Sequence, residues 1–104
     1  MGRCFLYWCP YTFPMPTIAV VIPCRNDAAL LDRCLASFDA QTRPADAVVV
    51  VDNGSTDASA DTARAHGAEV VAEPRRGITW AGAAGYDRAA QLGADIIVRT
   101  DADA

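Results

Sequence analysis

Two aspartates near the end of the sequence have the spacing of a metal-binding carboxylate pair. Asp101 and Asp103 stand two residues apart, directly after the apolar run 96–98. Carboxylate oxygens placed in this way suit a hard divalent cation, Mg²⁺ or Mn²⁺, which keeps further positions open for phosphate oxygens. The alternative is a pair of solvated acids on a loop, and the spacing alone is compatible with both.

Other polar clusters offer groups that could contact a nucleotide. Asp52 ends an apolar run, where an acid either caps the following turn or accepts hydrogen bonds from a ribose or a base. Arg75 and Arg76 lie in a loop marked by a proline and a glycine, where an arginine is either solvated or positioned to meet a phosphate. The polar residues 24–27 follow another apolar run.

The histidine, one tryptophan and the cysteines are not expected to form a catalytic or ligand-binding centre. His66 is predicted near the end of a helix, where a favourable interaction with the helix dipole accounts for it, so it is assigned no catalytic role. Trp80 is assigned to packing rather than to stacking on a ligand. The four cysteines form no CxxC pair and have no histidine at zinc spacing, so a metal-thiolate site is not expected and a reducing compartment is the simplest assumption.

The composition excludes several classes of protein. The chain has 104 residues, of which 52% are hydrophobic, and these values are typical of one globular domain. Nine arginines against thirteen acids give a net charge of -4, so a nucleic-acid platform is not expected. The sequence has no lysine, which excludes a Walker A loop, a Schiff-base amine and a lysine general base.

The first part of the chain is an uncharged stretch that has to be tested as a membrane span. No residue between Arg3 and Arg25 is charged, but four prolines interrupt the stretch. Proline breaks a helix, and lipid offers no water for the freed carbonyl groups, so no transmembrane segment is predicted. Residues 1–16 are interpreted as an irregular apolar leader.

The elements that must position the polar clusters alternate between strand and helix. Short aliphatic runs predict strands at residues 18–22, 47–51, 69–72 and 96–98. The first helix is predicted to be capped by Asn26 or Asp27 and to bury one apolar stripe. A second, alanine-rich helix is predicted to end at Gly67, and a third to run from about residue 79 to residue 92.

This alternation predicts an α/β fold with an open, mainly parallel sheet. In such sheets ligands bind beyond the carboxyl ends of the strands. The polar clusters all follow predicted strands, so they are expected to converge on one crevice; they are residues 24–27, 52–57, 75–77 and 101–103.

Taken together, three segments resemble the amino-terminal half of the family 2 glycosyltransferases. The segments are residues 18–27, 48–57 and 96–103, and the likeness covers residues 17–104. The resemblance implies that residues 17–104 form a partial GT-A domain, a Rossmann-like half that binds a nucleotide diphosphate sugar. Such enzymes transfer the sugar to an acceptor hydroxyl, and the sequence does not identify the acceptor.

The resemblance also implies the residues of the site. The expected nucleotide-sugar contacts are Pro23, Cys24, Arg25, Asp27, Asp52, Asn53, Arg76 and Asp101. Asp101 and Asp103 are expected to hold Mg²⁺ or Mn²⁺ at the donor diphosphate. Many relatives have two consecutive acids where this chain has Asp52 and Asn53; the Asn53 amide offers a donor and an acceptor to a base edge, which leaves the nucleotide preference open.

The resemblance places the acceptor-binding half and the general base beyond Ala104, so the chain is expected to be a donor-binding portion that does not turn over efficiently alone. A cytoplasmic location is expected, with the inner face of the membrane as a second possibility.

Two alternative functions stay open. A nucleotidyltransferase is weighed lower because residues 23–27 contain no glycine, and a non-catalytic nucleotide- or partner-binding module would leave the carboxylates solvated.

Overall fold

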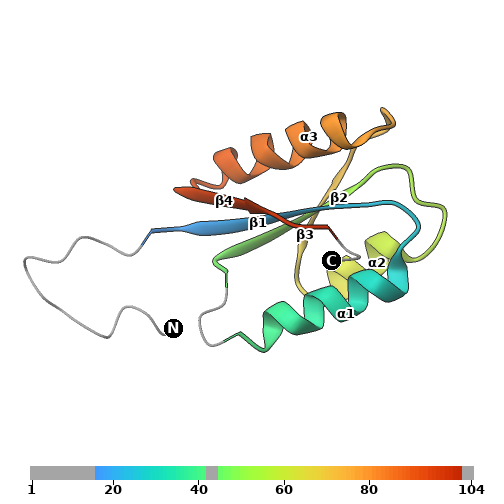
Figure 1. Ribbon diagram of the computed structural model, residues 1–104, viewed down its shortest axis with the longest axis horizontal. Helices are drawn as coiled ribbons and strands as arrows, with labels where there is room; N and C mark the ends of the chain where they lie inside the picture. The colour runs from blue at the N-terminus through green and yellow to red at the C-terminus, as the bar shows by residue number, and fades with distance from the viewer. Residues whose placement is uncertain (1–15, 42–44, 102–104) are drawn as a thin grey trace, which may run out of the picture.

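The computed structural model describes residues 16–41 and 45–101, along which strands and helices alternate (Figure 1). The elements are β1 (Ile18–Cys24), α1 (Ala28–Asp39), β2 (Ala47–Asp52), α2 (Ser59–Ala65), β3 (Glu69–Ala72), α3 (Ile78–Gln91) and β4 (Ile96–Arg99). Each predicted strand and helix is present near its predicted bounds. The predicted leader, apart from Pro16, and Asp103 of the acidic pair lie outside the described residues.

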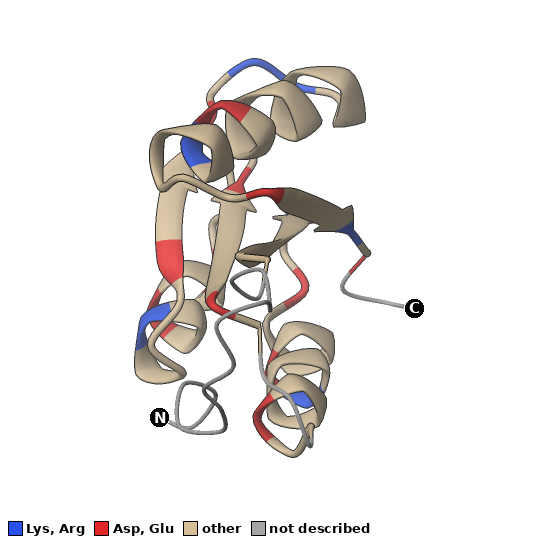
Figure 2. Ribbon diagram, turned by 90° about the vertical axis from the view of Figure 1, so that its left-hand side faces the viewer, with Lys and Arg blue, Asp and Glu red and all other residues tan. Residues whose placement is uncertain are grey.

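The strands form one parallel sheet in the order β3-β2-β1-β4. Val20 of β1 lies opposite Val48 of β2 and Val98 of β4. Helices α1 and α2 cover one face of the sheet and α3 covers the other, which gives three layers (Figures 1 and 2). The predicted open α/β sheet is confirmed.

Strand β1 contributes to a hydrophobic core on each face of the sheet, as its continuous aliphatic sequence predicts. On the face covered by α1 and α2, the core consists of Val20, Ile22, Cys24, Leu31, Leu35, Val50 and Ala63. On the face covered by α3, it consists of Ala19, Val21, Val49, Val51, Ala81 and Ala89. The α3 core is therefore built from small helix residues against valines of the sheet.

Gly85 allows α3 to lie close to the sheet. A Cβ atom at this position would overlap Cγ1 of Val21 and would lie 3.0 Å from Cγ2 of Val51. The helix therefore packs closely on the sheet at Gly85, where nothing larger than a hydrogen fits without a shift of α3 or of the valines.

Strand β1 continues through Pro23 to Cys24, beyond the predicted end at Ile22. The backbone carbonyl of Val21 faces β4, because it accepts the N–H of Thr100. Backbone groups two residues apart in a strand face the same side, so the nitrogen of Pro23 also faces β4. Strand β4 ends at Arg99, before it reaches Pro23, so the missing N–H of the proline removes no hydrogen bond between the strands. A proline is consequently tolerated at this end of the central strand.

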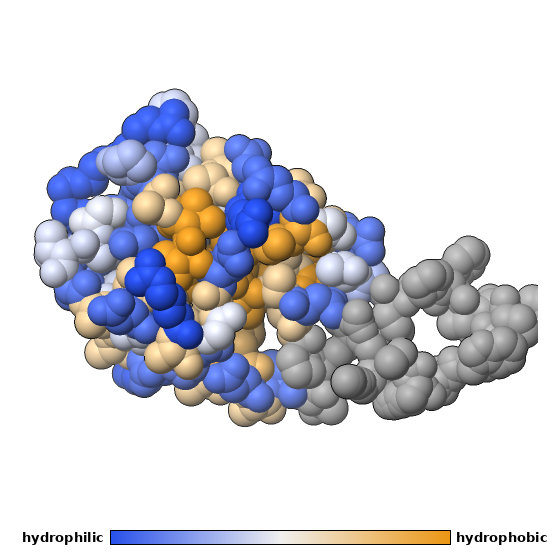
Figure 3. Space-filling model, turned by 180° about the vertical axis from the view of Figure 1, so that it is seen from behind, coloured by the Kyte–Doolittle hydropathy of each residue, from blue (hydrophilic) through white to orange (hydrophobic). Residues whose placement is uncertain are grey.

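The surface of the described residues is mixed in character. Basic and acidic residues are interspersed over the helices rather than gathered on one face (Figure 2). Seen from behind, the molecule shows apolar side chains in the middle of the face with hydrophilic residues around them (Figure 3). Among the described residues, no helix has both the length and the apolar character needed to cross a membrane.

Candidate functional site

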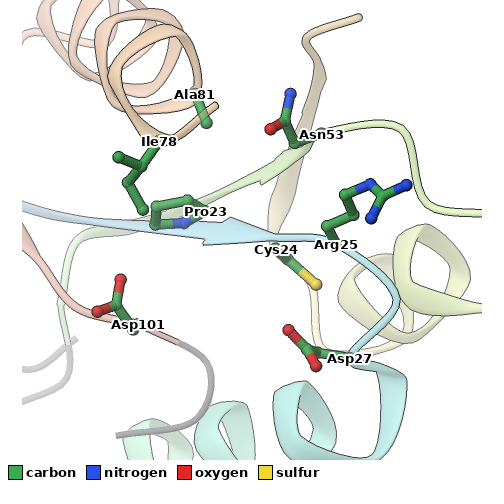
Figure 4. Close-up of a pocket in the computed structure, with 8 residues that line it drawn as sticks. All are labelled: Pro23, Cys24, Arg25, Asp27, Asn53, Ile78, Ala81 and Asp101. Atoms are coloured by element: carbon green, nitrogen blue, oxygen red, sulfur yellow. The ribbon is translucent and has the colours of Figure 1, made fainter. Parts of the chain in front are cut away.

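A pocket opens at the carboxyl ends of β1 and β2 and the end of β4 (Figure 4). Its volume is about 300 Å³, at the lower end of the range of small-molecule sites. The lining residues are Pro23, Cys24, Arg25, Asp27, Asn53, Ile78, Ala81 and Asp101. Predicted site residues that are distant in sequence are therefore brought to one place, as the convergence of the loops required.

Not all of the predicted site residues line the pocket. Asp52 and Arg76 do not line the pocket, whereas Ile78 and Ala81 of α3 line it without having been predicted. Their only sequence signal was their place directly after the loop 73–77. An apolar wall formed by the first turn of a helix carries no motif of its own, so its contribution to the pocket depends on the packing of α3.

The loop after β1 is fixed by the loop after β2. Asn26 adopts a left-handed conformation with φ of 55°, and its N–H donates to Ser55 Oγ over 2.9 Å. Asn26 Oδ1 accepts hydrogen bonds from Thr56 N–H at 2.7 Å and from the Thr56 hydroxyl at 3.2 Å. These bonds hold the segment that carries Arg25 and Asp27 against the second loop.

Residues of the second loop also cap helix α1. Asp57 Oδ2 accepts the N–H of Ala28 at 3.3 Å, and Ser59 Oγ accepts the N–H of Asp27 at 3.2 Å. Asp27 is the N-cap residue, one of the two that were predicted, but its side chain makes no cap hydrogen bond. The hydrogen bond from Ser59 chiefly lowers the pKa of Asp57, which stays ionised and suited to a helix N-terminus.

Cys24 supplies a buried thiol to the floor of the pocket. It is 3% exposed, and burial raises the pKa of this thiol, with a hydrogen bond to Ser59 acting in the opposite direction. The charges of Asp27 and Asp52 raise the pKa further. Cys24 is therefore a neutral, largely apolar lining residue at neutral pH and not an activated nucleophile.

Asp52, the last residue of β2, and Asn53, which follows it, hold loops in place. Asp52 Oδ1 accepts the N–H of Ser55 at 2.9 Å, which is the turn-capping role that the sequence left open. The Asn53 amide donates to the carbonyl oxygens of Glu73 and Arg75 at 2.7 and 2.8 Å. Its Oδ1 accepts the N–H of Gly77 at 3.1 Å. The contact of Asn53 with a base edge stays a prediction, whereas these loop contacts were not foreseen.

The loop between β3 and α3 is stiffened by a buried carboxylate. Glu73 is 5% exposed and accepts bonds from Arg75 Nε, Nη2 and backbone N–H, each at 2.9 Å. These bonds lower the pKa of Glu73 to about 2, and they raise the pKa of Arg75. Arg75 is thus committed to an internal contact.

Arg75 also stacks on Trp80, with the guanidinium carbon 3.8 Å from the ring centroid. Trp80 is 45% exposed, so the packing that was predicted for it is a contact with an arginine at the surface and not a place in the core. Within the described part of the chain, the side chains of Arg25 and Arg76 make no hydrogen bond or ion pair. Arg25 lines the pocket and Arg76 lies in the loop before α3, so both are available for an anionic ligand there.

Asp101 lies at the end of β4, on the side of the pocket next to Pro23 and Ile78 (Figure 4). Its side chain is 53% exposed and has a loose contact of 3.5 Å with Arg99 Nη2. A hard cation such as Mg²⁺ is typically bound through one or two carboxylates, waters and substrate phosphates. An open carboxylate beside a pocket fits that donor set, and no cluster of three candidate metal ligands occurs among the described residues.

His66 lies outside the pocket and joins two helices. Its Nε2 contacts Asp32 Oδ1 at 2.8 Å, and its Nδ1 contacts Asp39 Oδ2 at 2.9 Å. These hydrogen bonds, with Asp32 first and Asp39 second, raise the pKa of His66. The residue thus links the C-terminal end of α2 to α1, which gives it a structural place that the helix dipole alone did not indicate.

The sequence matches the model of glycosyl transferase family 2 over residues 19–104. The chain belongs to glycosyl transferase family 2. The resemblance of its three segments is thereby confirmed, and the order of strands and helices is that of the family's GT-A fold.

Proteins that are named as glycosyltransferases are among its relatives. It is 47% identical over 60 residues to an uncharacterized glycosyltransferase of Mycobacterium tuberculosis, a match that covers 58% of this chain and 26% of the relative. It is 36% identical over 91 residues to the 4,4'-diaponeurosporenoate glycosyltransferase of Staphylococcus haemolyticus, covering 84% of this chain and 24% of the relative. The chain thus spans about a quarter of the length of these relatives.

Solved structures of a glucosyl-transferring synthase also match this chain. Glucosyl-3-phosphoglycerate synthase of M. tuberculosis superimposes with a TM-score of 0.70 and 31% identity, over 85% of this chain and 34% of the synthase. Its complex with Mn²⁺, UDP-glucose and phosphoglyceric acid gives a TM-score of 0.68 at 30% identity, over 84% of this chain and 33% of the synthase.

Proposed function

We propose that this chain is the donor-binding portion of a family 2 glycosyltransferase and that its pocket binds a nucleoside diphosphate sugar together with a divalent cation. The observation that carries the proposal is the convergence of Pro23, Arg25, Asp27, Asn53 and Asp101 on one pocket at the carboxyl end of a parallel sheet. This is the edge at which open α/β sheets bind ligands. Transfer of the sugar to an acceptor hydroxyl is proposed for the whole enzyme.

The charges of the pocket support a diphosphate ligand. Arg25 lines the pocket, and its guanidinium makes no hydrogen bond or ion pair with another described residue, so it is free to pair with a phosphate oxygen. Arg76 follows Arg75 in the neighbouring loop and offers a second cation. The nucleoside is proposed to lie toward Pro23 and Asp27, where a carboxylate acceptor suits the hydroxyl groups of a ribose.

The proposed cation ligands are Asp101 and Asp103, the pair with the DxD spacing. When bound, the ion stabilises the charge that develops on the diphosphate leaving group as the glycosidic bond breaks. The chain's own contribution is to direct the Asp101 carboxylate to the pocket from the end of β4. Glucosyl-3-phosphoglycerate synthase was crystallised with UDP and either Mn²⁺ or Mg²⁺, which supports the use of UDP and Mn²⁺ as ligands in the binding experiments below.

Membership of the family disfavours the nucleotidyltransferase alternative. A reducing, cytoplasmic compartment stays a prediction; the buried Cys24 thiol is free, which is compatible with it.

Asp101→Ala tests the proposal against the non-catalytic module. We expect the full chain to bind UDP in the presence of Mn²⁺, and we expect the variant to bind it about tenfold or more weakly, because one cation ligand is lost. Without metal the two proteins are expected to bind UDP alike. Isothermal titration calorimetry measures both affinities.

Asp61→Ala is the matched control, because Asp61 is an exposed acid on α2, outside the residues that line the pocket, and pairs with the exposed Arg64 at 3.3 Å. It is expected to leave UDP affinity unchanged. No heat with any nucleoside diphosphate in a folded sample, with or without Mn²⁺, contradicts the proposed function, and equal affinities of wild type and Asp101→Ala contradict the role of Asp101.

A further inference from the structure

Asn53 makes an unusually complete set of contacts with the loop between β3 and α3. Its two amide hydrogens are directed at the carbonyl oxygens of Glu73 and Arg75, and its carbonyl oxygen accepts the N–H of Gly77. A carboxamide offers two donors and one carbonyl acceptor, so each of its polar groups has a partner. The residue is 7% exposed, which makes the loss of any of these bonds costly.

The backbone of Asn53 is fixed by the sheet. Its N–H donates to Cys24 O at 2.9 Å, and the neighbouring Asp52 O accepts the N–H of Glu73 at 3.0 Å. The Asn53 side chain therefore extends from a rigid strand end. Its hydrogen bonds to the loop 73–77 consequently fix the position of that loop relative to β1 and β2. This is a suitable anchor for a loop at the rim of a pocket.

The contacts continue from the loop to the pocket wall. Gly77, which accepts no side chain easily because its φ is 121°, is the N-cap residue of α3, and its carbonyl accepts the N–H of Ala81 at 3.1 Å. Ala81 and Ile78 form the apolar wall of the pocket. Asn53 thus reaches this wall through Gly77 in addition to lining the pocket itself.

We propose that Asn53 is a positioning residue, which holds the loop 73–77 and the first turn of α3 against the pocket and requires a carboxamide for this task. The inference rests on the proposed function insofar as it concerns donor binding. A carboxylate here would place an oxygen opposite two carbonyl oxygens and would lose both donated bonds. The Glu73–Arg75 pair holds the loop independently, so Asn53→Asp is expected to displace the loop and not to unfold the protein.

Asn53→Asp in the full chain tests this inference, with Gln41→Glu as the matched control. Gln41 undergoes the same change from amide to acid at an exposed position after α1, where its Nε2 is 3.4 Å from Ser37 O. We expect hydrogen exchange of the Gly77 and Ala81 amides to accelerate about tenfold in Asn53→Asp at neutral pH and to be unchanged in Gln41→Glu. In a Trp8→Phe background, the fluorescence of Trp80 reports the same displacement.

The pH profile separates positioning by a carboxamide from simple loss of a side chain. Protonation restores one donor to the aspartic acid, so the exchange rates and Trp80 fluorescence of Asn53→Asp are expected to return toward wild type as the pH falls. Asn53→Ala has no such group and is expected to stay displaced at every pH. Affinity for UDP with Mn²⁺ is expected to fall about tenfold in Asn53→Asp at neutral pH.

Exchange of the Asn53 side-chain amide in ¹⁵N-labelled wild type provides a measurement that needs no variant. Protection of both side-chain protons is expected, and exchange at the rate of a free amide overturns the inference. Unchanged Gly77 and Ala81 exchange in Asn53→Asp overturns it as well. If wild type binds no UDP, the proposed function fails, and the ligand-free measurements still decide the role of Asn53.

Discussion

At the scale of single residues, the loop between β3 and α3 depends on groups that neutralise one another. The Glu73 carboxylate is buried and accepts hydrogen bonds from Nε, Nη2 and the backbone N–H of Arg75. The guanidinium of Arg75 also stacks on Trp80. Arg75 is therefore engaged within the protein, and the adjacent Arg76 is the residue of the pair that is free for a ligand. Of these two neighbouring arginines, Arg75 thus holds the loop and Arg76 is open to a ligand.

Glu73→Gln is expected to destabilise the protein more at neutral than at acid pH. The pKa of Glu73 in the folded protein is about 2, below its ordinary value of 4.5. Its contribution to the free energy of unfolding is therefore fully present above the ordinary pKa and is lost as the pH falls toward 2. Thermal unfolding between about pH 7 and pH 3 should show the difference in Tm between wild type and variant shrinking with acidity.

Asp61→Asn, at an acid whose side chain is 84% exposed, provides the control and is expected to change Tm little at either pH. A difference in Tm between wild type and Glu73→Gln that stays the same across the acid range contradicts the account of the carboxylate.

At the scale of elements, the site depends on contacts between loops and helices that are distant in sequence. Asp57 and Ser59, which precede or begin α2, cap α1, and His66 at the other end of α2 joins α1 through Asp32 and Asp39. Helices α1 and α2 are thereby joined near both ends. This pairing holds the loop that carries Arg25 and Asp27 in a fixed relation to the end of β2.

Gly85→Ala is expected to lower the stability of the protein by roughly 1–3 kcal/mol or more, because the added methyl group overlaps Val21 and cannot be accommodated without moving α3. Gly82→Ala is the matched control on the same helix. Its Cβ would lie 3.6 Å from Tyr86, an ordinary contact, and the change is expected to be neutral or to stabilise by up to about 1 kcal/mol through helix propensity.

Urea unfolding followed by circular dichroism measures both variants. Equal stabilities of Gly85→Ala and Gly82→Ala would show that α3 does not pack on the sheet as closely as described.

Local sequence patterns were sufficient to predict the elements. The aliphatic run at residues 18–22 and the stripe of α1 report burial directly, so the strands, the helices and the parallel sheet followed from them. Residues 24–27, 52–57, 75–77 and 101–103 were predicted to meet because carboxyl ends of parallel strands share an edge. Arg25, Asp27, Asn53 and Asp101 do line one pocket, whereas no residue of 75–77 lines it.

The contacts that local patterns could not supply are those that join distant segments. The capping of α1 by Asp57, the hydrogen bonds of Asn53 to the loop 73–77 and the stacking of Arg75 on Trp80 all depend on the path of a loop. An asparagine after a strand has the same local preference whether its amide meets a ligand or a backbone. Only the position of Glu73, Arg75 and Gly77 in space distinguishes the two roles.

At the scale of the whole molecule, three layers bring one edge of a parallel sheet to a pocket with both signs of charge. Arg25 is available to phosphate oxygens, and Asp101 is available to a cation, so the edge suits a metal-bound diphosphate better than either a bare anion or a bare cation. The chain spans about a third of the solved synthase structures, and donor binding is the part of the reaction that this region is proposed to perform.

Paramagnetic broadening by Mn²⁺ in the presence of UDP locates the ion on the protein and so tests the proposed donor site. In the NMR spectrum of the ¹⁵N-labelled chain, we expect substoichiometric Mn²⁺ to broaden the amide signals of Arg25, Asp27 and Asp101 first. The signals around His66, where Asp32 and Asp39 form another acidic surface, should stay sharp. Broadening centred on His66, with the signals of the pocket unaffected, would contradict the account.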